Sequence, residues 1–211
     1  MKKVTLPYDN QVPATAYPFY VIEGIDGSGK SSIGPLVAER IQAAFFEQPA
    51  SFRLAQPFID QEADIKARFL FYLGYNLQTS KEITQMASNR PVIGVRYLYT
   101  TIVYHIAKGL PEDWVWEMVS NLPLLRPRKV FFLDVSDPDV QKERIGRRGA
   151  TDEDKRTFEI MSQIRSLYFD FQSTMPGFTY IDTSYLSMEE VTNKIINEVE
   201  LKSIQYAYHH G

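Results

Sequence analysis

The 211-residue chain contains no cysteine. This absence excludes disulfides and thiolate metal sites, and it suits a reducing compartment such as the cytoplasm. No apolar run approaches the roughly 20 residues that cross a bilayer, and no apolar core follows Lys2 and Lys3 as it would in a signal peptide. The net charge of −3 also lacks the basic surplus of a general nucleic-acid-binding protein. We therefore expect a cytoplasmic protein that binds neither membranes nor nucleic acid.

What the chain does contain is typical of a globular domain, with 44% hydrophobic and 23% charged residues. Short β-rich runs alternate with longer helical patterns. This alternation predicts an α/β fold of three layers, with a parallel sheet of about five strands and helices on both faces. The predicted strands are 19–23, 50–55, 91–95, 129–134 and 178–182. The predicted helices are 30–46, 61–87, 98–108, 112–121, 137–147, 153–173 and 187–204.

Composition along the chain predicts a single domain with short extensions. Three prolines in residues 5–18 indicate a loosely held arm at 1–18, before a domain at 19–204 and a tail at 205–211. Two helix starts are marked by capping patterns, Ser136-x-x-Asp139 and Ser187-x-x-Glu190.

The most specific motif is G-x-x-x-x-G-K-S at residues 24–31, which follows a predicted strand and opens a predicted helix. Glycines at these points let the backbone N–H groups surround a polyphosphate, which the helix N-terminus also attracts. In this pattern Lys30 reaches the β- and γ-phosphates, and the Ser31 hydroxyl ligates Mg²⁺. We therefore predict an ATP and Mg²⁺ site rather than a simple glycine-rich turn. The predicted ATP-binding residues of the loop are Gly24, Asp26, Gly27, Ser28, Gly29, Lys30, Ser31 and Ser32.

The loop phrase I-E-G-I-D-G-S-G-K-S at 22–31 resembles that of thymidylate kinases. Arg96-Tyr97 with Thr100-Thr101 and Tyr104 is similar to that family's Asp-Arg-Tyr…Ser-Ser…Ala-Tyr segment. The basic stretch at 137–149, the helix at 158–168 and the strand and loop at 180–184 resemble the lid approach, the following helix and the adenine-side loop. The resemblance covers about residues 19–204. It implies a P-loop kinase with a short mobile lid at about 144–157, which forms homodimers, with the apolar face of 65–77 as one candidate interface.

This resemblance implies transfer of the ATP γ-phosphate to a nucleoside monophosphate, dTMP or a related one. It assigns catalysis to Lys30, Arg96, Arg147, Arg148 and Asp26, and adds Arg144 to the ATP site. The alternative for the three lid arginines is a solvated basic helix end. Asp26 would contact the acceptor sugar or metal-bound water, or else only stabilise its own turn. Asp134, at the end of a predicted strand, is assigned a structural role.

The acceptor-binding residues implied by the resemblance are Gln56, Phe71, Tyr75, Arg96, Thr101 and Tyr104. Phe71 would stack on the acceptor base and Tyr104 would support the sugar, although an aromatic stretch at helical spacing fits core packing equally well.

The match departs from the family on the acceptor side. Val95 replaces the aspartate of the Asp-Arg pair, Ala55-Gln56-Pro57 aligns with an Arg-Glu-Pro phrase, and Tyr75 aligns with an arginine. Losing two charge-assisted hydrogen bonds would weaken a phosphorylated acceptor by about 10² to 10⁴-fold, unless Arg53 or Arg68 substitutes. Two alternatives to a monophosphate kinase therefore stay open: a kinase of the same fold that acts on a nucleoside or small alcohol, and a nucleotide-binding protein with little catalysis.

Overall fold

The computed structural model describes residues 13–48, 50–149 and 157–209. Five parallel strands form one sheet in the order β2-β3-β1-β4-β5. In chain order they are β1 (Phe19–Gly24), β2 (Ala44–Phe46), β3 (Val92–Val95), β4 (Lys129–Asp134) and β5 (Phe178–Asp182). The predicted α/β fold with a five-stranded parallel sheet is confirmed.

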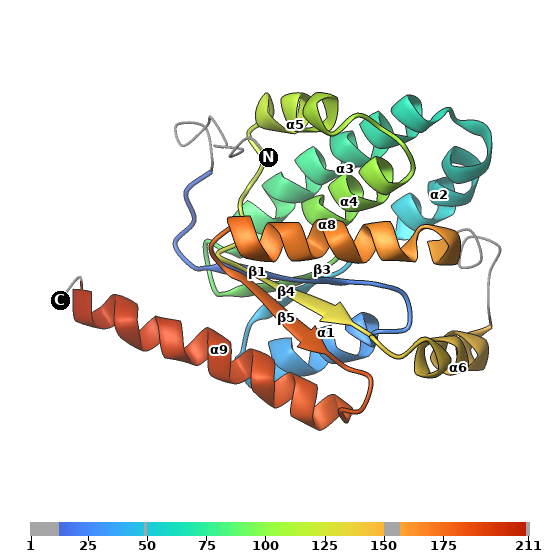
Figure 1. Ribbon diagram of the computed structural model, residues 1–211. Helices are drawn as coiled ribbons and strands as arrows, with labels where there is room; N and C mark the ends of the chain where they lie inside the picture. The colour runs from blue at the N-terminus through green and yellow to red at the C-terminus, as the bar shows by residue number, and fades with distance from the viewer. Residues whose placement is uncertain (1–12, 49, 150–156, 210–211) are drawn as a thin grey trace.

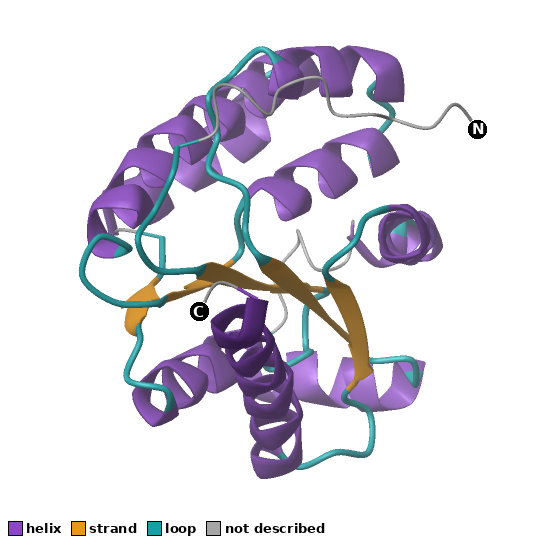
Figure 2. Ribbon diagram, turned by 90° about the vertical axis from the view of Figure 1, so that its left-hand side faces the viewer, coloured by secondary structure: helices purple, strands orange, loops and turns teal. Residues whose placement is uncertain are grey.

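Helices cover both faces of this sheet, as Figures 1 and 2 show. On one face lie α1 (Lys30–Arg40) and α9 (Met188–His209), and on the other lie α3 (Ile65–Met86), α4 (Leu98–Ala107), α5 (Glu112–Ser120) and α8 (Met161–Thr174). The other helices of the described residues include α2 (Ala50–Glu62), beside α3, and α6 (Pro138–Arg148), beyond the end of β4.

Strand β1 shows how the sheet separates two apolar cores. Successive side chains of a strand point to opposite faces. Phe19 and Val21 accordingly join the core under α3, α4 and α8, whereas Tyr20 and Ile22 join the core under α1 and α9. All six residues of β1 are buried, as expected for the central strand of a parallel sheet.

The predicted second strand at 50–55 is wrong. The strand is β2, whose Ala44, Phe45 and Phe46 pair with β3, and residues 50–62 form α2 instead. The first helix ends at Arg40, not at 46, which leaves the short apolar run free to form the sheet edge. In the segment predicted as a strand, Phe52 is buried and Leu54 is 74% exposed, as the two sides of a helix allow.

Three helix starts can be compared with the predictions. The helices predicted within 61–87 are the end of α2 and the whole of α3, which starts where the Asp64 side chain accepts from the N–H groups of Lys66 and Ala67. For α6 the N-cap is Asp137 rather than Ser136. The capping box of α9 is confirmed: Glu190 accepts from the N–H of Ser187 at 2.8 Å, and Ser187 Oγ accepts in return at 3.2 Å.

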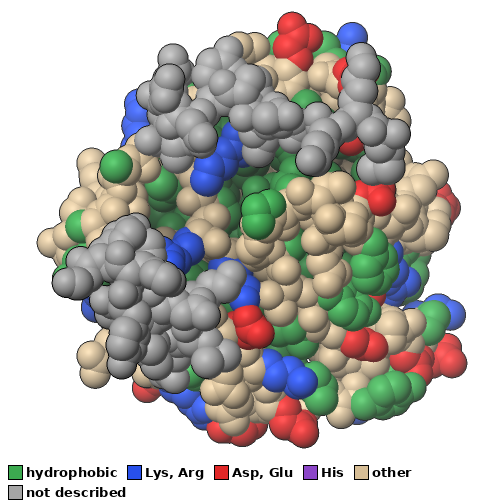
Figure 3. All heavy atoms as spheres, turned by 60° about the vertical axis from the view of Figure 1, so that its left-hand side comes forward, with side chains coloured by type: hydrophobic (Ala, Val, Ile, Leu, Met, Phe, Trp, Pro, Cys, Tyr) green, Lys and Arg blue, Asp and Glu red, His purple; other side chains and the backbone are tan. Residues whose placement is uncertain are grey.

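Several predictions fall on residues outside the described ones. They include most of the arm at 1–18 and residues 150–156 of the expected lid. None of the helices in the described part of the chain has both the length and the apolar character that crossing a bilayer requires. Figure 3 shows acidic and basic side chains interspersed with apolar ones over one face of the molecule.

Candidate active site

The glycine-rich loop connects β1 to α1 at the carboxyl edge of the sheet. Gly24 has φ +149°, and a Cβ there would lie 2.1 Å from the carbonyl oxygen of Leu133 on β4. Gly29 is the N-cap of α1 and has a left-handed backbone with φ +87°. A side chain would be obstructed at Gly24 and strained at both positions, so these glycines allow the tight loop that the motif predicts.

Lys30 is 4% exposed and lies within this loop. Its ammonium group donates to the Ile25 carbonyl oxygen and to Ser28 Oγ, the latter at 3.2 Å. A cavity of about 380 Å³, here termed the loop cavity, lies against the loop. Its wall includes Asp26, Gly27, Ser28, Gly29, Lys30, Ser31 and Ser32 of the loop region, together with Arg144, Thr183, Leu186, Met188 and Val191.

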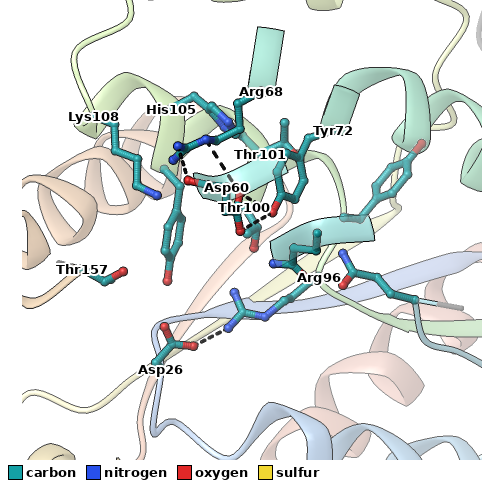
Figure 4. A pocket seen from close by; sticks show the side chains of 14 residues that line it. Asp26, Asp60, Arg68, Tyr72, Arg96, Thr100, Thr101, His105, Lys108 and Thr157 are labelled. Atoms are coloured by element: carbon teal, nitrogen blue, oxygen red, sulfur yellow. Dashed lines mark hydrogen bonds and ion pairs between the residues drawn. The ribbon is translucent and has the colours of Figure 1, made fainter. Parts of the chain in front are cut away.

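A second cavity of about 290 Å³ lies between α2, α3 and α4, and we term it the α2–α4 cavity (Figure 4). Each residue that lines it has a side chain with a polar group. The lining includes Gln56 and Asp60 from α2, Arg68 and Tyr72 from α3, and Thr101 and Tyr104 from α4.

Among the described residues, Asp26 and Arg96 are the two that line both cavities. Their side chains form an ion pair, visible in Figure 4. Arg96 follows β3 and has a left-handed backbone, φ 58°, which is uncommon for a residue other than glycine. Burial opposes the charge of its guanidinium, but the Asp26 carboxylate and the Tyr104 hydroxyl outweigh burial and raise the pKa of Arg96 above its ordinary value. A permanently charged cation therefore stands where the two cavities meet.

Glu23, the residue before Gly24, holds the segment that carries Arg96 in place through hydrogen bonds. The fully buried Glu23 carboxylate accepts from the Tyr97 N–H at 3.1 Å and from the Thr100 hydroxyl. Burial raises the pKa of Glu23, although the hydrogen bonds from Thr100 and Tyr97 act in the opposite direction. Sequence reasoning missed this role. An acidic residue at the end of an otherwise apolar strand was its signal.

At the end of the α2–α4 cavity away from Asp26, Asp60 of α2 interacts with two residues of α3. Both its carboxylate oxygens accept from the Tyr72 hydroxyl at 3.0 Å, and its Oδ1 lies 3.7 Å from Arg68 Nε. Arg68 also donates to the Asp60 carbonyl oxygen at 2.5 Å. From the sequence, Arg68 was expected only as a possible substitute, and Asp60 and Tyr72 were missed, because most of α2 was predicted to be a strand.

Phe71 and Tyr75 do not line the α2–α4 cavity. Both stack on Phe52 of α2, with ring centroids 5.4 Å and 3.8 Å from it. These contacts are of the kind that the apolar-packing alternative describes, and the stacking of Phe71 on an acceptor base stays a prediction. Tyr104 and Thr101 do line the cavity, and Thr101 accepts from Asn76 Nδ2 at 2.8 Å.

Gln56 lines the same cavity, but the reason for expecting it there was wrong. It lies inside α2 and does not follow the second strand. Since β2 ends at Phe46, the residues that follow it are Glu47 and Gln48, and Gln48 also lines the cavity. The alignment of Ala55-Gln56-Pro57 with the Arg-Glu-Pro phrase is therefore corrected.

The structure describes the side chains of two of the three expected lid arginines. Arg144 donates to the carbonyl oxygens of Thr183 and Ser184, at 2.8 and 3.1 Å, and lines the loop cavity. Arg147 is 76% exposed and pairs with Glu143, one helical turn away, at 2.5 Å. The Arg148 side chain lies outside the described part of the chain. Only Arg144 of the described two thus reaches a cavity.

Two acids near the sheet edge have structural partners. Asp134 is buried and accepts from Arg165 Nε at 2.9 Å and from the Tyr180 hydroxyl at 3.1 Å, in line with the expected structural role. Asp182 accepts from Ser136 and Ser184. Burial works to raise the pKa of Asp182, but these hydrogen bonds outweigh it and lower the pKa to about 2.

Comparison with known proteins places this geometry in context. A family model described as thymidylate kinase matches residues 22–195. The probable thymidylate kinase of Methanococcus maripaludis strain S2 is 28% identical over 192 residues, covering 86% of this chain and 94% of the relative. The thymidylate kinase of Leptospira interrogans strain Fiocruz L1-130 is 26% identical over 192 residues, covering 85% and 90%.

Two solved structures have a similar fold. The thymidylate kinase of Candida albicans superposes with a TM-score of 0.74 at 18% identity, covering 90% of this chain and 94% of its own. That of Ehrlichia chaffeensis gives 0.68 at 19%, covering 87% and 98%.

Proposed function

Since this chain belongs to the thymidylate kinase family, we propose that it transfers the γ-phosphate of ATP, bound with Mg²⁺, to a nucleoside monophosphate such as dTMP. The observation that carries the proposal is the position of Asp26 and Arg96, which line both the loop cavity and the α2–α4 cavity. We assign the loop cavity to ATP and the α2–α4 cavity to the acceptor. Arg96 then stands between donor and acceptor phosphates.

The loop cavity has the groups that a triphosphate and a magnesium ion need. The left-handed glycines open the loop backbone, the buried Lys30 ammonium supplies a positive charge, and the Ser31 hydroxyl is the ligand assigned to Mg²⁺. No cluster of three acids or histidines suited to a metal occurs among the described residues. Mg²⁺ commonly relies on one or two protein oxygens with substrate phosphates and water, and it would supply charge neutralisation between the phosphates.

The acceptor cavity suits a ligand that is already anionic. Transfer breaks the bond between the γ-phosphorus and its bridging oxygen, and forms a bond between that phosphorus and an acceptor phosphate oxygen. The products are ADP and a nucleoside diphosphate. A monophosphate oxygen needs no base to attack, so Arg96 has only to orient it and offset its charge. Lys30 and the loop amides stabilise the departing phosphate.

An uncharged alcohol acceptor would require a base to remove its proton. Asp26 is the one carboxylate among the described residues that lines both cavities, and it is held in the ion pair with Arg96. If Asp26 accepted a proton, it would lose its charge and with it the ion pair with Arg96. The structure therefore favours a phosphorylated acceptor over a nucleoside.

The test is a panel assay with the full chain, ATP and Mg²⁺, in which ADP release is followed with nucleoside monophosphates and the matching nucleosides. We expect turnover with at least one monophosphate, dTMP first among the candidates, and none with its nucleoside. The Lys30→Ala variant is the control for contaminating kinases. Turnover with nucleosides alone would make the protein a kinase of a different acceptor class. ATP binding without turnover would leave a nucleotide-binding protein.

We further propose a homodimer formed through α2 and α3. Leu54 and Phe58 lie one helical turn apart on α2 and are 74% and 67% exposed, and Leu70 on the adjacent α3 is 49% exposed. Such apolar side chains on neighbouring helices are typical of an interaction surface. Light scattering during size-exclusion chromatography should give the mass of two chains, and Leu54→Glu with Phe58→Glu should reduce it to one. A monomeric wild-type protein would contradict the proposal.

A further inference from the structure

Thr157 brings an unpaired hydroxyl to the acceptor cavity. The residue is 1% exposed, and its Oγ1 has no hydrogen-bond partner in the described part of the chain. It also lines the α2–α4 cavity. Figure 4 shows its hydroxyl turned toward the cavity, on the side of Asp26 and across from Asp60 and Arg68.

An unpaired buried hydroxyl is unfavourable for the protein on its own. It has lost its hydrogen bonds to water without gaining any within the fold, so native proteins rarely keep such a group. The Tyr97 and Tyr104 hydroxyls also line the cavity and have no hydrogen-bond partner among the described residues. Three other hydroxyls are satisfied: Thr100 donates to Glu23, Thr101 accepts from Asn76, and Tyr72 donates to Asp60. Thr157 differs from these three neighbours, and a ligand in the cavity can supply the missing partner.

The location of Thr157 indicates which part of the ligand this is. Asp26 and Arg96 mark the end of the cavity that meets the loop cavity, where the transferred phosphate must be. Asp60, Arg68 and Tyr72 form the opposite end. Because Thr157 lies on the Asp26 side in Figure 4, its hydroxyl faces the sugar and phosphate of an acceptor nucleotide rather than its base.

We propose that Thr157 is an acceptor-binding residue whose hydroxyl hydrogen-bonds the sugar–phosphate half of the acceptor nucleotide. The proposal rests on the assignment of the α2–α4 cavity to a nucleoside monophosphate. It adds a contact from the segment that precedes α8, which the sequence analysis did not identify. The contact is independent of the base, so it contributes to affinity for acceptors in general.

Two matched variants test it. Thr157→Val replaces the hydroxyl with a methyl group of similar size, and Thr157→Ser keeps the hydroxyl and removes the methyl. For Thr157→Val we expect the acceptor KM to rise about 2- to 12-fold, the range that one neutral hydrogen bond gives, with the KM for ATP unchanged. We expect the Tm of the ligand-free protein to stay the same or rise, because the unpaired polar group is gone.

The serine variant should show the reverse pattern, with a lower Tm from the lost methyl contacts and an acceptor KM near that of wild type. The loss in Thr157→Val should also be equal for two monophosphates that differ only in their base. An unchanged acceptor KM in Thr157→Val, or a loss confined to one base, would overturn the inference. A lower Tm in Thr157→Val would indicate a structural role and would also overturn it.

The two proposals fail in distinguishable ways. Wild-type turnover with an unchanged KM in Thr157→Val contradicts only the role of Thr157. If the wild type turns over no monophosphate, the proposed function fails, and calorimetric titration of dTMP into wild type and Thr157→Val then decides the inference by the same ratio of affinities.

Discussion

The two cavities of this protein are built in different ways. The loop cavity is formed largely by consecutive residues, 26–33, whose backbone is shaped by glycines. Arg96, α6, the β5–α9 loop and α9 complete its wall. The α2–α4 cavity is formed by side chains from α2, α3, α4, the glycine-rich loop, the segments that follow β2 and β3, and Thr157. These side chains meet only because the sheet and helices pack as they do. A site made of backbone tolerates sequence change around it, whereas a site made of distant side chains changes its ligand when a few residues change.

The largest expected effect sharpens this contrast on the loop side. Lys30→Ala should lower kcat by about 10²-fold or more, the scale of losing a charged stabiliser of the transition state. The fold should persist, because the interactions of Lys30 described here lie within its own loop. Steady-state kinetics and circular dichroism measure the two effects. Retained activity would show that phosphoryl transfer does not occur at this loop.

Arg96→Gln tests the junction between the cavities. One charge-assisted hydrogen bond accounts for about 10- to 150-fold in kcat/KM for the acceptor, and we expect a loss in this range. The KM for ATP should change less, because Lys30 and the loop amides remain. Combination with Asp26→Asn should be less than additive, since the two side chains form one ion pair. Full additivity would mean that the pair does not act as a unit.

The arginines of α6 offer a comparison within one helix. Arg144→Ala should raise the KM for ATP about 5- to 10-fold, because Arg144 lines the loop cavity and bonds the Thr183 and Ser184 carbonyls. Arg147→Ala with Arg148→Ala should instead lower kcat more than it raises this KM, as loss of transition-state contacts does. An effect of the double variant confined to KM would assign these arginines to simple ATP binding.

The smallest expected effect concerns pH and the edge of the loop cavity. The pKa of Asp182 is about 2 in the folded protein, below its ordinary value of 3.8. Its ionised form therefore stabilises the fold above about pH 4, and this contribution is lost as the pH falls toward 2. Asp182→Asn should lower the Tm by about 2 °C at pH 7, and the difference from wild type should shrink below pH 4. A difference independent of pH would contradict the assignment.

The position and backbone of the glycine-rich loop could be predicted from the sequence because its geometry is local. Glycines, a lysine and a serine at fixed spacing specify the loop without reference to the rest of the chain. Four of the five strands were also located, since each is a short, mostly apolar run between helical patterns. The missed strand, β2, has only three residues. In residues 51–54, apolar Phe52 and Leu54 alternate with polar residues, which is typical of a strand although these residues belong to α2.

The acceptor side could not be predicted in the same way because it depends on where helices break and which face they turn inward. The pairing of Asp60 with Arg68 and Tyr72 follows from the break at Asp64. An aromatic stretch such as Phe69 to Tyr75 can face a ligand or another helix, and spacing alone does not choose between them. Here Phe52 on α2 decides the outcome for Phe71 and Tyr75, and α2 was not recognised.

The position of Glu23 affects how the protein can open locally around its site. Its backbone belongs to the central strand, its neighbour Gly24 begins the glycine-rich loop, and its carboxylate accepts from the amide of Tyr97, the N-cap residue of α4. The Tyr97 amide is therefore exposed to solvent exchange only when a contact with the middle of the sheet is broken. Glu23 thus links the glycine-rich loop to the segment that carries Arg96. A motion that separates these two parts of the site has to break a hydrogen bond to the central strand of the sheet.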